Sequence, residues 1–272
     1  MIGEEGVYAP KNETRSAVGW LDRFRPEEVI AKVPQEQWQD FMTGMTAIFQ
    51  LVVEHEQPYV LIVPWRGAEP LRWALEVMAE RVGARMPQVV ELPLGSHVDV
   101  YNYKFMSGLK GQEKEAIVKA YMETVWEIRG KQPVAKAVLL DEAQSGQTFA
   151  QAIHHLGKFL RQCAGCEQVE LVGIAAKDAR KGTRKTSKGF VNLVRKGKTK
   201  VHVVSMAMPQ IDRPHLLPLI LSQDPSVRAQ EARYERWELL EMMGNPQGEG
   251  VFKQMAKEAL DDMGWPYVKV EG

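Results

Sequence analysis

Two acidic residues and a small polar turn follow one another in the stretch VLLDEAQSGQT, which runs from Val138 to Thr148. Asp141 and Glu142 come after four apolar residues, as at the end of a buried strand. Adjacent carboxylates there need hydroxyl groups, a cation or water, because burying an unpaired charge is costly. The next residues, Ser145, Gly146, Gln147 and Thr148, offer hydroxyls and backbone N–H groups at the start of a predicted helix, a favourable place for an anion. Acids for hydroxyls beside a turn for a phosphate predict a sugar-phosphate site.

A plainer interpretation of the same residues is a solvated strand end followed by an ordinary helix cap. The position of the stretch in the fold separates the two interpretations. In an open α/β sheet, ligands bind beyond the carboxyl ends of the strands. The elements around the stretch therefore decide how much weight the sugar-phosphate hypothesis carries.

Short apolar runs alternate with helical segments along most of the chain. Continuous apolar runs suit strands that are buried on both faces of a parallel sheet. The predicted strands cover 59–63, 89–93, 135–140, 170–176 and 201–204, and the predicted helices cover 36–54, 69–83, 113–129, 147–161, 226–243 and 250–263. Right-handed crossovers place the loops that follow the strands at one edge of the sheet. The fold class is thus α/β, an open and mostly parallel sheet with helical N- and C-terminal additions.

Composition bounds the class of protein. The 272 residues suffice for one large α/β domain with additions, and we divide them into an N-terminal arm (1–35), an α/β core (36–207) and a C-terminal helical extension (208–272). Lys and Arg together number 35, as do Asp and Glu, so net charge argues neither for nor against a polyanionic partner. Two cysteines exclude a disulfide scaffold. With no signal-peptide pattern and no long apolar run, we expect a cytoplasmic protein without a membrane partner.

A second loop resembles the first in its setting. The residues VLIVPWRGA, from Val60 to Ala68, join a predicted strand to a predicted helix. Arg66 can pair with phosphate oxygens, and Gly67 lets the backbone approach a ligand closely. The alternative for Arg66 is a surface ion pair.

Taken together, the two loops resemble those of the type I phosphoribosyltransferase family, over roughly residues 36–205. The resemblance implies a sheet of the phosphoribosyltransferase type and a Mg²⁺-dependent transfer of phosphoribose between pyrophosphate and a nucleobase-like acceptor. It implies that Asp141 and Glu142 face the ribose of phosphoribosyl pyrophosphate (PRPP) or of a nucleoside monophosphate, and that Ser145 to Thr148 hold the 5-phosphate. Trp65, Arg66 and Gly67 would then form the pyrophosphate loop. Asp141 or Glu142 is the best candidate for a general base.

The stretch departs from the family pattern in two respects. Two residues, Ala143 and Gln144, stand between the acids and the Ser-Gly turn where the family usually has three, and the second acid is Glu rather than Asp. The PRPP loop is thus one residue shorter. The resemblance also implies a mobile loop over 94–112, with Tyr103 and Lys104 among its candidates, and base contacts from Lys177 and Asp178. An ordinary surface excursion is the alternative for 94–112.

The stretch from Lys177 to Lys200 holds ten Lys or Arg residues and a single acid. It suits a phosphorylated substrate or a nucleic-acid backbone, although Phe190 is its only aromatic residue. The plainer interpretation is a solvated hairpin. This stretch carries the alternative function, a non-catalytic, regulatory or nucleic-acid-binding protein of the same fold; a scaffold subunit is a third. Cys163 and Cys166 lack the further ligands that a zinc site needs, so no metal site is predicted from them.

Overall fold

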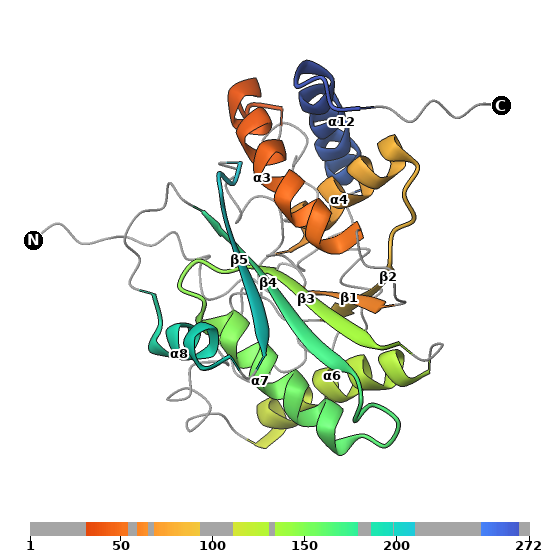
Figure 1. The fold of residues 1–272 in the computed structure, drawn as a ribbon, viewed down its shortest axis with the longest axis vertical. Helices are drawn as coiled ribbons and strands as arrows, with labels where there is room; N and C mark the ends of the chain where they lie inside the picture. Colours follow the sequence, from red (N-terminus) through yellow and green to blue (C-terminus); the bar gives the residue numbers. More distant parts are fainter. Residues whose placement is uncertain are drawn as a thin grey trace, which may run out of the picture.

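The computed structural model describes residues 31–53, 59–64, 68–92, 111–130, 134–178, 186–197, 199–209 and 246–266. Within these ranges five parallel strands form one open sheet in the order β2-β1-β3-β4-β5 (Figure 1). The strands are β1 (Tyr59–Pro64), β2 (Gln88–Leu92), β3 (Lys136–Glu142), β4 (Glu170–Asp178) and β5 (Lys200–Met206). The predicted α/β class with an open parallel sheet is confirmed.

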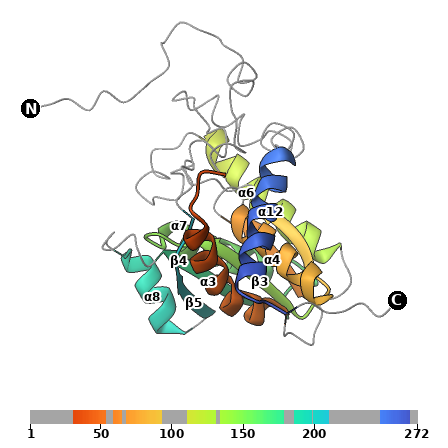
Figure 2. The ribbon, with the colours of Figure 1, turned by 90° about the horizontal axis from the view of Figure 1, so that it is seen from above.

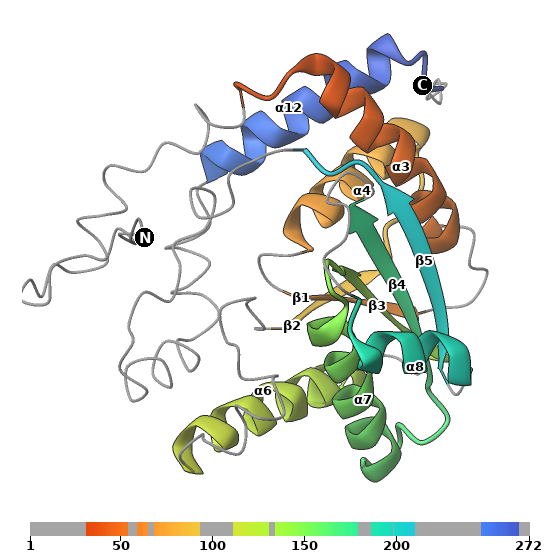
Figure 3. The ribbon, with the colours of Figure 1, turned by 90° about the vertical axis from the view of Figure 1, so that its left-hand side faces the viewer.

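Helices cover both faces of the sheet, as the view in Figure 3 makes plain. One face carries α3 (Gln35–Val53), α4 (Glu69–Val82) and α12 (Pro246–Asp262), and the other carries α6 (Gly111–Arg129), α7 (Gln147–Gln162) and α8 (Lys188–Lys196). The connection from β1 to β2 crosses one face, and the later connections cross the other. This is the doubly wound arrangement that right-handed crossovers produce.

Alternation along the strands divides the apolar residues into two cores. The α4-side core joins α3, α4 and α12 to strand residues such as Leu61 and Leu140. The α7-side core joins α6, α7 and α8 to strand residues such as Ile62 and Leu139. Each strand feeds both cores because successive side chains point to opposite faces. This alternation fixes the face on which each polar residue at the strand ends lies.

Helix α12 contributes fully buried side chains to the α4-side core. Phe252 is fully buried, and its ring lies edge-on to Trp38, Phe41 and Trp73 at centroid distances of 4.8, 5.9 and 5.4 Å. Figure 2 shows α12 lying alongside α3 and α4. The prediction of a helix near 250–263 is confirmed, with a start four residues earlier at Pro246. The predicted helix over 226–243 lies outside the described residues.

Two sequence expectations need correction. The strands predicted to end at Leu140 and Ala176 continue to Glu142 and Asp178, because the parallel ladder pairs Glu142 with Ala176 and Asp178 with Met206. The solvated hairpin considered for 177–200 is wrong where the structure describes it. Residues 188–196 form the helix α8, which Ser187 caps at its start and Gly197 ends in a left-handed conformation.

Candidate functional site at the carboxyl edge of the sheet

The strand order creates a switch point between β1 and β3. The chain leaves β1 toward β2 on one side, whereas β3 lies on the other side, paired in register from Tyr59 opposite Lys136 to Ile62 opposite Leu139. In open α/β sheets of this order, the crevice beyond such a point is where ligands bind. The two loops singled out from the sequence follow β1 and β3, the two strands on either side of this switch point.

Asp141 and Glu142 are the last two residues of β3, and both are buried, with 5% and 8% of their surface exposed. Leu139 belongs to the α7-side core and Leu140 to the α4-side core. Alternation therefore turns Asp141 toward the α7 face and Glu142 toward the α4 face. Gln144 Nε2 donates to Glu142 Oε1 at 3.3 Å. The acids thus bracket the strand end instead of forming one pair on one face.

The turn that follows β3 is shaped by Gly146. This residue has φ +73°, and a β-carbon placed on it would lie 2.3 Å from Cγ of Phe190. Phe190 itself is buried against Phe149, with ring centroids 5.8 Å apart. In the sequence Phe190 stands among basic residues, but in the structure its side chain belongs to the α7-side core. It is therefore not an exposed platform for a nucleic-acid base.

The amino terminus of α7 opens at this turn. Its N-cap residue is Gly146, which has no side chain that could cap the helix. Ser145 Oγ lies 3.4 Å from the backbone nitrogen of Gln147, a long contact for a hydrogen bond. Ser145, Gln147 and Thr148 are half-buried, so their polar groups remain within reach of a ligand. N–H groups in the first turn of a 16-residue helix are well suited to bind an anion.

Helix α8 begins beside the same turn. The backbone N–H of Ser187 donates to the carbonyl oxygen of Ser145 at 2.9 Å, which fixes the start of α8 against the turn. In contrast to α7, this helix is capped by a side chain, because Ser187 Oγ accepts from the N–H of Phe190 at 3.2 Å. The two helix starts are thus adjacent, and the uncapped one belongs to the predicted phosphate turn.

The two predicted base contacts lie one strand further along. Asp178 is the last residue of β4 and is buried, with 6% of its surface exposed. The Nζ atom of Lys177 donates to Thr186 Oγ1 at 3.2 Å, across the segment that leads into α8. Asp178 follows Ala176 by two residues along β4, so its side chain lies on the same face, the α4 face. Lys177 lies between them and points to the α7 face. Only one of them therefore shares a face with Glu142.

Several predicted site residues lie outside the described residues. They are Trp65, Arg66 and Gly67 of the pyrophosphate loop, and Tyr103 and Lys104 of the expected mobile loop. Their roles stay predictions. What the structure describes is the pair of anchors of the first loop, Pro64 at the end of β1 and Ala68 before α4, whose backbone N–H donates to the carbonyl oxygen of Pro64 at 3.3 Å.

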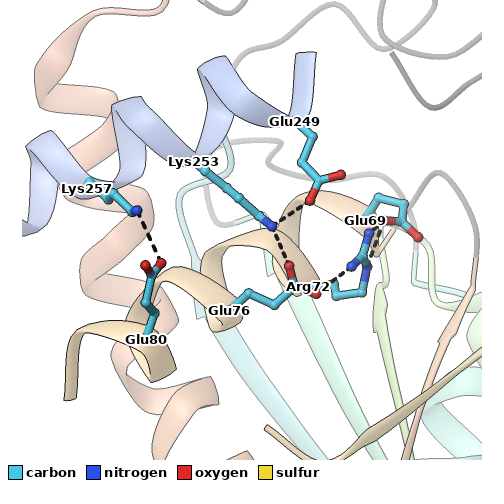
Figure 4. Close-up of polar contacts among 7 residues, drawn as sticks. All are labelled: Glu69, Arg72, Glu76, Glu80, Glu249, Lys253 and Lys257. Carbon is cyan, nitrogen blue, oxygen red and sulfur yellow. Dashed lines mark hydrogen bonds and ion pairs between the residues drawn. The ribbon is translucent and has the colours of Figure 1, made fainter. Parts of the chain in front are cut away.

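Glu69 is a polar residue of this edge that the sequence analysis missed. It is the first residue of α4 and only 5% exposed. Arg72 donates to its Oε2 atom from Nε at 2.9 Å and from Nη2 at 2.7 Å, as Figure 4 shows. Its Oε1 atom is buried and, among the described residues, has no hydrogen-bond partner. An acid in the first turn of a helix is ordinary, so the sequence carried no signal of this arrangement.

Burial has the largest effect on the pKa of the Glu69 carboxyl. Loss of hydration raises the pKa of Glu69; the positive charge and hydrogen bonds of Arg72 oppose that rise, and the nearby carboxylates of Glu91 and Glu76 add to it. Burial disfavours the charged form of Arg72, but Glu69 and Glu76 raise the pKa of its guanidinium. Ion pairs then continue from Glu76 to Lys253 of α12 at 2.7 Å (Figure 4).

The carboxylates at this edge suit a hard cation that brings its own oxygen ligands. The described residues contain no group of three or more His, Cys, Asp or Glu side chains arranged to hold a metal ion by themselves. Mg²⁺ commonly binds through one or two carboxylates together with substrate phosphates and waters. Glu69, whose Oε1 atom is buried and has no hydrogen-bond partner within the described ranges, offers one such carboxylate oxygen.

Comparison of the chain with protein-family models, with curated proteins and with solved structures returned no match. None of the helices in the described ranges is both long enough and apolar enough to cross a membrane. The functional inference therefore depends on the fold and on the residues at its carboxyl edge.

Proposed function

We propose that the protein binds PRPP or a nucleoside monophosphate at the β1/β3 switch point and transfers phosphoribose to or from a nucleobase-like acceptor. The observation that carries this proposal is the combination at the end of β3. Two buried acids are followed by a turn of four residues, and the last of these, the left-handed Gly146, is the N-cap of a helix without a side-chain cap. Acids bind ribose hydroxyls, and an open helix start binds a phosphate.

Different residues would bind different parts of the ligand. The first turn of α7, with Ser145 and Thr148, holds the 5-phosphate, and Asp141 and Glu142 accept hydrogen bonds from the ribose hydroxyls. Arg66 would pair with the pyrophosphate, and Lys177 and Asp178, at the end of the neighbouring strand β4, would contact the acceptor. Tyr103 and Lys104 would cover the site.

In the reaction the bond between C1 of the ribose and a pyrophosphate oxygen breaks, and a bond between C1 and a ring nitrogen of the acceptor forms. The bonding electrons leave with the pyrophosphate, and the proton of the acceptor nitrogen passes to Asp141 or Glu142. Positive charge builds on the ribose carbon, so buried carboxylates beside it stabilise the transition state. Mg²⁺ bound to the pyrophosphate would neutralise the charge of the leaving group.

Calorimetric titration of PRPP and Mg²⁺ into the wild type and into Asp141→Asn tests the proposal. We expect the wild type to bind and the variant to bind about tenfold or more weakly, because hydrogen bonds to a buried charged group are strong. Glu170→Gln, which removes a carboxylate at the opposite end of the neighbouring strand β4, serves as the control and should bind like the wild type. Absence of binding to the wild type would contradict the proposal.

One observation favours a second candidate, a protein of the same fold that binds a nucleic-acid backbone. Lys188, Arg195, Lys196 and Lys200 are all exposed along α8 and the start of β5. With Phe190 buried, this surface suits phosphates rather than stacked bases. Binding of a labelled DNA duplex that falls steeply with salt and is abolished by changing these four residues to Glu would support this candidate. The Asp141→Asn variant should leave such binding unchanged.

A further inference from the structure

We propose that Glu69 is a further ligand residue of this site, and that its unpartnered Oε1 atom binds a divalent cation of the Mg²⁺ class. The inference rests on the proposed function only for the identity of the phosphate ligand that accompanies the cation. Nothing in the sequence pattern of the two loops assigns a role to this residue. The case for it comes from how its carboxylate is held.

The two oxygens of Glu69 are treated differently by their surroundings. Arg72 directs two nitrogens, Nε and Nη2, at the same oxygen, Oε2. A guanidinium that faces a carboxylate squarely would share its donors between both oxygens. Here Oε1 is left buried and, within the described residues, without a donor. Figure 4 shows Glu69 at the end of the network, with one carboxylate oxygen turned away from Arg72.

Such an oxygen is expensive to leave unsatisfied. A buried acceptor without a partner costs about 1–3 kcal/mol, and more when the group is charged. Protonation alone does not remove this cost, because the new O–H group would need an acceptor in the same place. A ligand that supplies a positive centre to Oε1 satisfies the atom directly.

The charges around Glu69 favour a cation over a neutral donor. Three carboxylates, Glu69, Glu76 and Glu249, share the two cations Arg72 and Lys253, so with all five groups ionised this network has one negative charge in excess. Glu91, at the end of β2, is close enough to raise the pKa of Glu69 further. A divalent cation neutralises this excess, whereas a neutral hydroxyl or amide does not.

Glu69 lies at the same edge of the sheet as the predicted phosphate turn, because α4 follows β1 and α7 follows the parallel strand β3. Glu69 opens α4 directly after the loop that borders the switch point. Glu142 and Asp178 alternate with the same period as the strand residues of the α4-side core, so one buried acid of β3 and one of β4 lie on the face of the sheet that α4 covers. A cation at Oε1 would thus lie on the carboxyl edge, beside the loop assigned to the pyrophosphate.

The experiment uses Mn²⁺, a paramagnetic substitute for Mg²⁺, and measures the free ion by electron paramagnetic resonance during titration of the full chain. The ion is titrated alone and with PRPP into the wild type, Glu69→Gln and Glu80→Gln. Glu80 lies on the same helix, and its side chain is 69% exposed. We expect the wild type and Glu80→Gln to bind Mn²⁺ alike, and Glu69→Gln to bind it about tenfold or more weakly.

Equal binding by Glu69→Gln and the wild type would overturn the inference, as would a wild type that binds no Mn²⁺ with or without PRPP. Circular dichroism checks that Glu69→Gln is folded; if it is not, Glu69→Asp replaces it and must weaken binding while keeping the charge. Mn²⁺ binding that depends on Glu69 but is unaffected by PRPP would contradict the proposed function alone. If the wild type and Glu69→Gln bound PRPP equally well, and both only in the presence of the metal, the result would contradict only the role of Glu69.

Discussion

The ring of Phe190 occupies the space that a side chain at Gly146 would need, since a β-carbon there would lie 2.3 Å from Cγ and 2.7 Å from Cβ of Phe190. These atoms are the root of the phenylalanine side chain, which cannot swing aside as a flexible tip would. The turn after β3 and the helix α8 therefore pack closely against each other at Gly146. The main-chain bond from Ser187 to Ser145 strengthens the same junction.

Gly146→Ala is expected to lower the free energy of unfolding by about 2–5 kcal/mol. The left-handed backbone conformation costs an L-residue about 1–2 kcal/mol, and overpacking against Phe190 adds about 1–3 kcal/mol. Urea denaturation followed by circular dichroism measures the change. Gly197→Ala is the matched control, because Gly197 has φ +62° while no heavy atom of the described residues lies within 4 Å of the added carbon. Equal losses in the two variants would contradict the packing account.

Phe252→Ala should destabilise the protein by about 3–5 kcal/mol, because it empties the centre of the aromatic cluster that joins α12 to α3 and α4. Lys257→Met, one turn further along α12, removes only an exposed ion pair with Glu80 at 3.2 Å and should change stability by less than about 1 kcal/mol. Thermal and urea denaturation of both variants test this. A loss of under about 1 kcal/mol in Phe252→Ala would mean that the core closes without α12.

The sequence was sufficient for the order of strands and helices because their signals are strong and local. Val60 to Val63 form a continuous apolar run, and the helix predicted over 69–83 ends at Val82, with Gly83 as its left-handed C-cap. The helix predicted over 36–54 agrees with α3 to within one residue at each end, and the buried residues of α3 from Trp38 to Val52 follow helical spacing. These features need no knowledge of what packs against them.

The details of the site depend on tertiary pairing, which local patterns do not carry. Asp141, Glu142 and Asp178 look like strand ends because they are polar, yet neighbouring strands extend the ladder through them. Glu69 looks like an ordinary first-turn acid, and only its burial distinguishes it. Helix α8 is preceded by Ser187 and followed by Gly197, and both residues are typical helix boundary signals. The many basic residues of this stretch favoured an interpretation based on charge instead.

The pH dependence of stability should report on Glu69. Because the pKa of this carboxyl is raised in the folded protein, the folded state holds the proton more tightly than the unfolded state, whose carboxyl titrates near its ordinary value of 4.5. The unfolding free energy therefore falls as pH rises from that value through the folded pKa. Relative to wild type, Glu69→Gln should gain stability over this window. Urea denaturation at a series of pH values measures the difference.

Glu80→Gln removes a carboxylate from the exposed face of the same helix and separates this effect from a general loss of negative charge. The stability difference between Glu80→Gln and the wild type should stay nearly flat over the same pH range. A flat difference for Glu69→Gln as well would contradict the raised pKa of Glu69.

The two cysteines should differ in their reaction with an alkylating reagent. Cys163 is half-buried at the end of α7, whereas Cys166 is buried, and burial together with the charge and hydrogen bond of Cys163 raises the pKa of the Cys166 thiol. Since the thiolate is the nucleophile, a short pulse of iodoacetamide at neutral pH should add one group, at Cys163. Peptide mass spectrometry locates it, and Cys163→Ser should leave the folded chain unmodified until denaturant is added. Modification of Cys166 first would contradict the burial that keeps its thiol protonated.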